Sequence, residues 1–143
     1  MCGISGIIGG SFVSARPLIE RMVAAQHHRG PDAGVTTFPH GAALGHNRLA
    51  VIDLSEHANQ PFTDHEQRLH LVYNGAIYNF QALRVELQQL GFEFRTSSDT
   101  EVVLHAFQQW GEQCVEHFNG MFAFAIWDAW QQRLFVARDR LGE

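Results

Sequence analysis

Apolar residues recur along the chain with two different periods, and the change of period separates strands from helices. Residues 3–9 alternate small and branched side chains between glycines, which predicts a buried strand. Strand-like runs follow at 34–38 and 42–52. Near the end, residues 121–127 and 133–137 are almost continuously apolar and are joined by a polar turn. Such continuity predicts strands that are buried on both faces, as in a sheet held between two other layers.

Helical spacing appears in three places. Pro17 suits the first turn of a helix, and apolar residues at 18, 19, 22 and 23 give the stripe of a helix that ends near Gly30. Leucines at 83, 87 and 90 define a second helix, stopped by Gly91. A third has apolar residues at 102, 103, 106 and 107, and Ser98 with Glu101 three residues later predicts a capping box. Because helices and strands are segregated along the chain, the predicted fold class is α+β.

The composition fits one compact domain and excludes several chemistries. With 143 residues and 45% hydrophobic side chains, the chain can bury a core. All ten Lys and Arg positions are arginine, so a Walker phosphate loop, a lysine Schiff base and a Ser-Lys pair are excluded. A net charge of -5 without a basic stripe argues against nucleic acid as a partner. No apolar run reaches the roughly 18 to 20 residues that cross a membrane. The start also lacks the positive region of a secretory signal, so we expect a cytoplasmic protein.

Cys2 is the first residue that suggests chemistry. Loss of Met1 would leave the Cys2 thiol beside a free α-amine, and their ordinary pKa values, about 8.5 and about 7.7 to 8.0, are close enough for proton exchange at neutral pH. The amine could then act as general base. The alternative is a cysteine without a function. Cys2 and Cys114 are expected to be free thiols, and the nine histidines, with only His27 and His28 close together, do not predict a metal site.

Asn74 and Gly75 allow two interpretations. They lie between apolar runs at 69–73 and 76–78, and Asn-Gly in such a setting predicts a tight hairpin turn. Alternatively, the Asn74 amide and the Gly75 N–H form an oxyanion hole, since glycine lets the backbone approach a developing negative charge. A second Asn-Gly pair, at 119–120, provides an internal comparison.

Two charged residues are candidates for binding an amino acid. Arg48 stands at the edge of an apolar strand, and its planar guanidinium suits a carboxylate. Asp99 stands at a predicted helix start, where it either caps the helix or binds a substrate ammonium group.

Together these segments resemble the class II glutamine amidotransferases, N-terminal-nucleophile (Ntn) hydrolases whose glutaminase domain begins Cys-Gly-Ile, and they look closest to the glutamine-hydrolysing asparagine synthetases. The matching segments are residues 1–4, 28–32, 45–54, 59–61, 73–75, 98–101, 118–124 and 137–142. Ala76 departs from the family, which commonly has an acidic residue after Asn-Gly. The resemblance implies a four-layer αββα sandwich, with two antiparallel sheets face to face and helices outside.

The resemblance also implies a role for each candidate residue. Cys2 would attack the side-chain amide carbon of L-glutamine with its α-amine as base, and Asn74 and Gly75 would hold the oxyanion. Arg48 would bind the α-carboxylate, and Asp99 would pair with the α-ammonium group. The pocket would be lined by Leu49, Val51 and Ile52. Water would then release glutamate, while the Asn-Gly pair at 119–120 takes no part.

From the resemblance we expect residues 1–143 to be a glutaminase domain that stops just short of its own end. A C-terminal synthetase domain that uses ATP and Mg²⁺ is expected in the full-length chain, whereas the glutaminase domain itself is expected to need no cofactor or metal. The expected partners are L-glutamine and the synthetase domain, and an exposed sheet edge would also allow a homodimer.

Two alternatives remain at this stage. The glutaminase domain could feed another acceptor, as in amidophosphoribosyltransferase, glucosamine-phosphate synthase, or asparagine-synthetase-like enzymes that amidate natural products or glycans. The chain could instead be a catalytically silent docking module.

Overall fold

The structure, a computed structural model, describes residues 2–9 and 12–142, so the expected removal of Met1 concerns a residue outside this range. Its elements follow one another as β1 (Gly3–Ile8), α1 (Phe12–Ala25), β2 (Ala33–Thr37), β3 (Ala42–Arg48), β4 (Phe62–Thr63), β5 (Leu69–Ile77), α2 (Phe80–Gln89), α3 (Asp99–Trp110), β6 (Gly120–Asp128) and β7 (Arg133–Arg138). Short 3₁₀ turns occur at His27–Arg29, Glu56–Ala58 and Gly111–Glu116.

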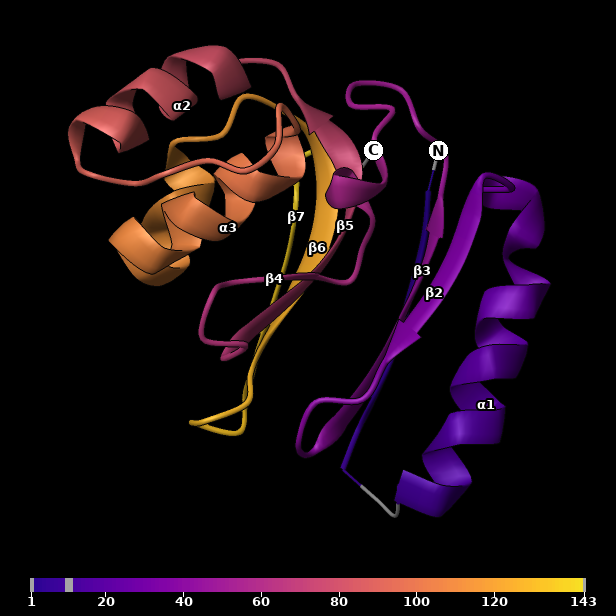
Figure 1. The fold of residues 1–143 in the computed structure, drawn as a ribbon. Helices are drawn as coiled ribbons and strands as arrows, with labels where there is room; N and C mark the ends of the chain where they lie inside the picture. The colour runs from indigo at the N-terminus through magenta and orange to yellow at the C-terminus, as the bar shows by residue number, and fades with distance from the viewer. Residues whose placement is uncertain (1, 10–11, 143) are drawn as a thin grey trace.

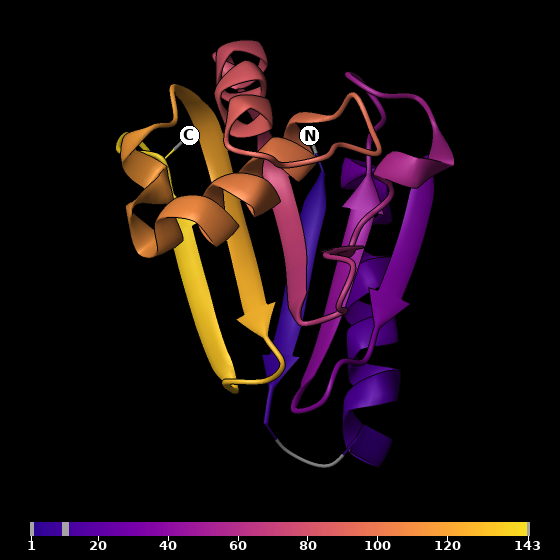
Figure 2. The same cartoon turned by 60° about the vertical axis from the view of Figure 1, so that its left-hand side comes forward.

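Two antiparallel sheets lie face to face, and helices cover their outer sides (Figure 1). The first sheet has the strand order β1-β3-β2, and the second has the order β4-β5-β6-β7. Helix α1 packs on the first sheet, while α2 and α3 lie outside the second, as Figure 2 also shows. The predicted α+β class and four-layer αββα arrangement are therefore confirmed. None of the helices in the described part of the chain is long and apolar enough to cross a membrane.

Each boundary between layers has its own apolar cluster. Ile19 of α1 is fully buried against Ala43 of β3. Between the sheets, Leu44 packs with Val72 and Trp127. The largest cluster lies between the second sheet and its helices, and includes Leu71, Tyr73, Phe124, Leu87, Val102 and Leu104. Burying one large side chain of this kind contributes about 1.5 to 3 kcal/mol, so this third boundary holds most of the apolar stabilisation.

The first helix differs from the prediction at its start. It begins at Phe12, so Pro17 lies inside α1 rather than in its first turn. Ala15 and Ile19, spaced i, i+4, are buried, whereas Leu18 is 43% exposed. Residues 18 and 19 point in different directions, so only one of these two apolar residues can face the sheet. The apolar stripe at 18, 19, 22 and 23 therefore did not show where the helix begins.

The later helices agree better with their patterns. Leu83 and Leu87 of α2 are buried, and Gly91 follows with a φ of +96°, which a glycine adopts without strain. Ser98 is the N-cap of α3, and its hydroxyl accepts a hydrogen bond from the Thr100 N–H at 3.0 Å.

The hairpin predicted at Asn74-Gly75 is wrong, because both residues lie inside the continuous strand β5. A Cβ on Gly75 would lie 2.3 Å from the Met121 carbonyl oxygen, so close approach of β5 to β6 requires the glycine. In the second Asn-Gly pair, Gly120 is the first residue of β6 and pairs with Ile77. Local sequence signals a turn at both sites, but pairing between β5 and β6 overrides it.

Two other strand predictions need correction. The strand predicted over 42–52 ends at Arg48, where the chain turns away because the Asp32 N–H donates to the Arg48 carbonyl and the Ala50 N–H donates to the Asp32 carboxylate. Burial on both faces is confirmed for β6 only over residues 126–128, since residues 121, 123 and 125 on one face are half-buried. It is wrong for β7, an edge strand in which Val136 is 63% exposed.

His46 links the two sheets directly. It lies on β3, is 1% exposed, and its Nε2 donates to the Tyr73 carbonyl of β5 at 3.1 Å. A carbonyl only accepts, so Nε2 carries the hydrogen. Burial lowers the pKa of His46 to about 4, and the fold therefore holds a neutral imidazole at neutral pH.

This burial predicts a pH-dependent loss of stability. The unfolded chain binds a proton at His46 below about pH 6.5, while the folded chain binds it only near pH 4. The free energy of unfolding should therefore fall as the pH drops from 6.5 to 4. Of this loss, His46 should account for roughly 3 kcal/mol at the acid end. Urea unfolding of the protein and of His46→Gln, whose amide can still donate to Tyr73, measures this at several pH values.

The free-energy difference between the two proteins should narrow as the pH falls. His70, whose pKa burial also lowers, is common to both and cancels. Two parallel pH curves would contradict the assignment.

Candidate active site

One small cavity brings together all the residues that the sequence singled out. It has a volume of about 170 Å³ and lies where β1 begins and β3 ends. Its lining includes Cys2, Arg48, Leu49, Val51, Ile52, Asn74, Gly75 and Asp99. Pockets for drug-sized ligands measure roughly 300 to 1,000 Å³, so this cavity suits a smaller molecule.

Cys2 stands beside the end of β3. The Leu49 N–H donates to its Sγ at 3.4 Å, and the thiol in turn lies 3.7 Å from the Leu49 carbonyl oxygen. Both Cys2 and Cys114 are free thiols, as expected.

The segment 28–32, to which no role was assigned from the sequence, packs against this end of β3. Arg29 donates from Nε to the Cys2 carbonyl at 3.0 Å. Gly30 packs so tightly that a Cβ there would lie 2.4 Å from the Asn47 carbonyl oxygen. Arg29 thus fixes the backbone that carries the Cys2 thiol. At position 30 only a glycine fits against the backbone of β3.

Arg48 is 8% exposed, and its guanidinium is already held on one side. Nη1 donates to the Ser55 carbonyl at 2.7 Å and to Asn59 Oδ1 at 2.8 Å, while Nη2 donates to the Asp53 carbonyl. These bonds use three of the five N–H groups. Nε–H and the second Nη2–H, for which no acceptor is seen among the described residues, form the edge that can bind a carboxylate with two hydrogen bonds.

The loop that holds Arg48 is tied across the cavity to the start of α3. Asp53 Oδ2 accepts from the Ser97 N–H and hydroxyl, both at 3.0 Å. Hydrogen bonds from Ser55 and Ser97 keep the pKa of Asp53 well below its usual range, so this carboxylate stays ionised. The loop carrying Val51 and Ile52 is thereby fixed at both sides of the cavity.

Asp99 is not the helix cap, because Ser98 takes that role. Its Oδ2 accepts from the Tyr73 hydroxyl at 2.6 Å and from the Ile77 N–H at 3.1 Å. Burial raises the pKa of Asp99, although these hydrogen bonds work in the opposite direction. A cation that enters the cavity would therefore stabilise the ionised form of this buried carboxylate.

The edge of β5 next to the cavity supplies a backbone donor. Strand β4 pairs only with residues 70 and 71 of β5. Beyond it, the Tyr73 N–H donates to Gln60 Oε1 at 2.6 Å and the Ile77 N–H to Asp99. Because alternate residues of a strand point their N–H groups to the same edge, the Gly75 N–H lies between these two, and no acceptor for it is seen in the described part of the chain.

The Asn74 side chain lies on the face of β5 opposite to that of Tyr73, because successive side chains of a strand alternate between its two faces. Its Oδ1 is buried without a partner among the described residues, while its side chain lines the cavity. Gln60 and Tyr73, by contrast, were given no role by the sequence. Both lie in segments that carry the resemblance, 59–61 and 73–75, and that was the only signal for them.

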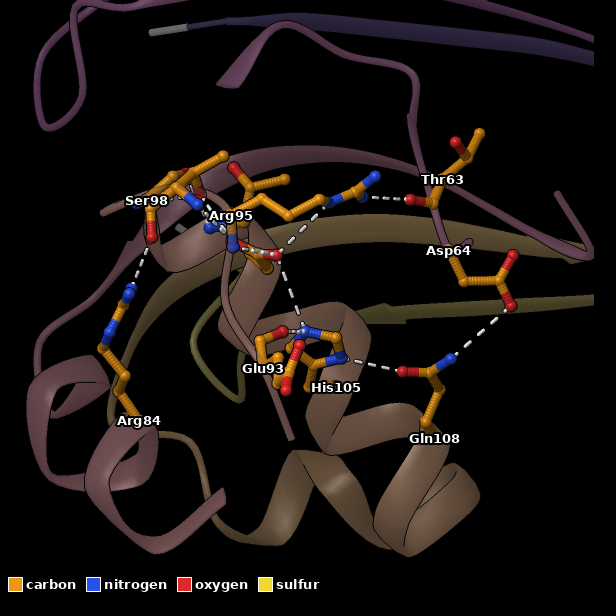
Figure 3. A network of polar contacts seen from close by, with 11 residues as sticks. Thr63, Asp64, Arg84, Glu93, Arg95, Ser98, His105 and Gln108 are labelled. Atoms are coloured by element: carbon orange, nitrogen blue, oxygen red, sulfur yellow. Dashed lines mark hydrogen bonds and ion pairs between the residues drawn. The ribbon is translucent and has the colours of Figure 1, made fainter. Parts of the chain in front are cut away.

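A buried network supports the start of α3 from outside the cavity (Figure 3). The predicted capping box does not close, because Glu101 accepts from the backbone N–H groups of Arg95 and Thr96, at 2.9 and 2.7 Å, instead of from Ser98. Burial would raise the pKa of Glu101, but hydrogen bonds from His105, Arg95 and Thr96 outweigh it and hold the pKa at about 2. No group of three or more metal-ligating side chains is seen within the described ranges.

Solved structures with a similar arrangement are amidotransferases. Glutamine phosphoribosylpyrophosphate amidotransferase from B. subtilis, solved with ADP and GMP, superposes with a TM-score of 0.58 at 29% identity, covering 71% of this chain and 24% of that one. An allosteric regulatory enzyme of purine biosynthesis gives 0.58 at 28% identity, covering 69% and 23%. The fold is therefore that of an Ntn-type amidotransferase. The glutamine amidotransferase domain family matches residues 1–143, and the chain belongs to that family.

Curated relatives are longer proteins. Asparagine synthetase [glutamine-hydrolyzing] 3 of Bacillus subtilis strain 168 is 43% identical over 99% of this chain, which covers 24% of that protein. A putative asparagine synthetase of Methanocaldococcus jannaschii is 38% identical over 99% of the chain and 30% of its own length. The amidase chry2 of Gibberella zeae is 37% identical, with 99% and 23% covered. The chain spans a quarter to a third of these relatives.

The close contact at Gly75 predicts a position-specific cost. Gly75→Ala places a Cβ against the Met121 carbonyl oxygen and the Phe122 backbone, so it should destabilise the protein by about 1 to 3 kcal/mol. Gly34→Ala is the matched control, because its Cβ would meet side chains and not backbone, those of Val23 at 3.2 Å and Asn47 at 3.6 Å. That change should stay within about 0.5 kcal/mol. Denaturant unfolding measures both, and equal effects would contradict the interpretation.

Proposed function

We propose that this chain hydrolyses L-glutamine to glutamate and ammonia, with Cys2 as nucleophile. The observation that supports this most directly is the set of groups around one cavity: a thiol, an unused backbone N–H at Gly75, an open guanidinium edge at Arg48 and the Asp99 carboxylate. These are the groups that an amino acid with a side-chain amide requires.

Arg48 and Asp99 select the substrate. The α-carboxylate of glutamine takes the open edge of Arg48, and its α-ammonium group takes Asp99, which places the side-chain amide toward Cys2. A simple amide would leave the charge of Arg48 or Asp99 buried without a partner. The loss of binding free energy would be larger than for a missing apolar contact.

Each chemical step uses a group of this chain. The α-amine of Cys2, free once Met1 is removed, takes the thiol proton as Sγ attacks the amide carbon. The carbonyl oxygen becomes an oxyanion, which accepts from the Gly75 N–H and the Asn74 amide. The amine returns its proton to the departing ammonia, and water hydrolyses the thioester to glutamate and the free thiol. No cofactor or metal is required by these steps.

The ammonia then serves a second domain. Because the chain spans only part of its relatives, we propose that residues 1–143 act as the glutaminase part of a longer cytoplasmic enzyme. In that enzyme a synthetase domain would amidate aspartate with ATP and Mg²⁺. The similarity to glutamine-hydrolysing asparagine synthetases supports asparagine as the product. The relation to a phosphoribosylpyrophosphate amidotransferase keeps another ammonia acceptor as the second candidate.

A comparison of the two cysteines tests the nucleophile. Cys2→Ala should abolish glutamate formation and leave the thermal unfolding temperature unchanged, because Cys2 lies at the cavity wall. Cys114→Ala is the control, since Cys114 is buried in the apolar cluster and burial raises its pKa to about 12. It should keep the activity. Glutamate release by Cys2→Ala, or none by the Met1-free protein with both cysteines intact, would refute the proposal.

The absence of lysine makes the base testable by chemistry. After removal of Met1, the α-amine of Cys2 is the only primary amine in the chain. One equivalent of an amine-acylating reagent should therefore modify one site, as mass spectrometry can verify, and abolish activity. Protein that retains Met1 should be inactive in the same assay, because its Cys2 nitrogen is an amide. A monoacylated protein that keeps its rate would exclude the amine as base.

A further inference from the structure

Tyr73 makes three hydrogen bonds to three different parts of the fold. Its hydroxyl donates to Asp99 of α3, its N–H donates to Gln60 of the loop before β4, and its carbonyl accepts from His46 of β3. The side chain is 2% exposed and belongs to the apolar cluster beneath α2 and α3. The next residue along β5 is Asn74 of the proposed oxyanion hole.

The hydrogen bond to Asp99 has a fixed direction. Burial, together with the neighbouring Asp99 carboxylate, raises the pKa of Tyr73 far above its usual value, so the phenol stays protonated and always donates. The distance of 2.6 Å from the hydroxyl oxygen to Oδ2 is that of a strong, charge-assisted bond.

A second donor reaches the same carboxylate oxygen. The Ile77 N–H lies 3.1 Å from Oδ2, four residues further along β5. Two donors from one strand on one oxygen fix the rotation of the carboxylate about its Cβ–Cγ bond. The face that Asp99 presents to the cavity is therefore set mainly by β5, with smaller contributions from the backbone N–H groups of Asp99 and Thr100 at the start of α3.

We propose that Tyr73 is a positioning residue for substrate selection: its hydroxyl orients the Asp99 carboxylate so that the cavity selects an amide with a free α-ammonium group. This inference rests on the proposed glutamine hydrolysis and deepens it, because it assigns the discrimination between an amino acid and a simple acid amide to a residue outside the reacting set.

The apolar and polar roles of Tyr73 can be separated. Tyr73→Phe keeps the ring in the apolar cluster and removes one oxygen, which leaves the Asp99 carboxylate with backbone N–H donors. Tyr78→Phe is the matched control: it alters the only other tyrosine of the chain, which is 64% exposed.

Steady-state kinetics on two substrates provide the test. For L-glutamine, Tyr73→Phe should raise KM roughly tenfold and leave kcat within about twofold, because a hydrogen bond to a charged group is lost from binding and not from the reacting centre. For glutaramate, which is glutamine without its α-amino group, kcat/KM should not change. Tyr78→Phe should match the unmodified protein on both substrates.

A double substitution shows whether Tyr73 acts through Asp99. Asp99→Asn alone should raise KM for glutamine, and adding Tyr73→Phe should raise it little further, since the group being oriented has lost its charge. Full additivity of the two effects would overturn the proposal. So would an equal loss of kcat/KM on glutamine and glutaramate, which is the result of a purely structural role.

A binding experiment remains informative if Tyr73→Phe does not fold. In Tyr78→Phe protein, Tyr73 is the only tyrosine, so ¹³Cζ-labelled tyrosine gives a single resonance. L-glutamate should shift this resonance, while glutarate, which lacks the amino group, should not. Equal shifts with both ligands, or none with glutamate, would overturn the role of Tyr73. Failure of the unmodified protein to hydrolyse glutamine would instead refute the proposed function, and the binding result would still test Tyr73.

Discussion

The unpaired edge of β5 beyond Thr63 is the constraint on which the rest of the site depends. A buried backbone N–H without a partner costs about as much as a lost hydrogen bond, so a strand edge inside the fold needs acceptors. Two side chains supply them: Gln60 accepts from Tyr73, and Asp99 accepts from Ile77. Between them, Gly75 keeps a donor that faces the cavity. The early end of β4 thus creates both the binding space and the donor within it.

This arrangement makes the empty site electrostatically unfavourable. Asp99 is buried in a cavity whose walls satisfy it only in part, as its raised pKa indicates. Arg48 is buried as well, and part of its guanidinium faces the same space. A zwitterionic ligand compensates both charges at once. The desolvation of these two charges lowers the stability of the empty protein, and a zwitterionic ligand offsets that cost when it binds. Such compensation is a common origin of specificity in small polar sites.

The sequence was a good guide to the periodic elements and to which residues line the cavity, and a poor guide to local geometry. Alternation and continuous apolar runs placed β1, β5 and β6, since these patterns reflect burial directly. The Asn74-Gly75 pair failed as a turn signal because tight packing on Met121 also requires a glycine, and one sequence cannot distinguish the two reasons.

The residues that orient the site were beyond the reach of sequence patterns. Tyr73 reads as an apolar strand residue and Gln60 as a loop residue, and their contacts with Asp99 and Thr100 join positions 26 and 40 residues apart in the chain. The capping box failed for a related reason. Glu101 met the motif, but two backbone N–H groups of the preceding loop offered better donors than Ser98.

The thin apolar cluster between the sheets has a consequence for how this protein can change. Cys2 and Arg48 lie at the ends of strands of one sheet, and Asn74 and Gly75 lie on a strand of the other. The apolar cluster that separates the sheets is small, with Leu44, Val72 and Trp127 as its largest buried members. Packed sheets lie about 10 Å from each other, and a misplacement of about 1 Å can cost a hundredfold in rate. Side-chain volume in this layer acts as a spacer between nucleophile and oxyanion donors. This layer can therefore accept substitutions in which a larger side chain at one position is balanced by a smaller one at another. The larger cluster beneath α2 and α3, apart from Tyr73, can vary more freely without altering the reaction.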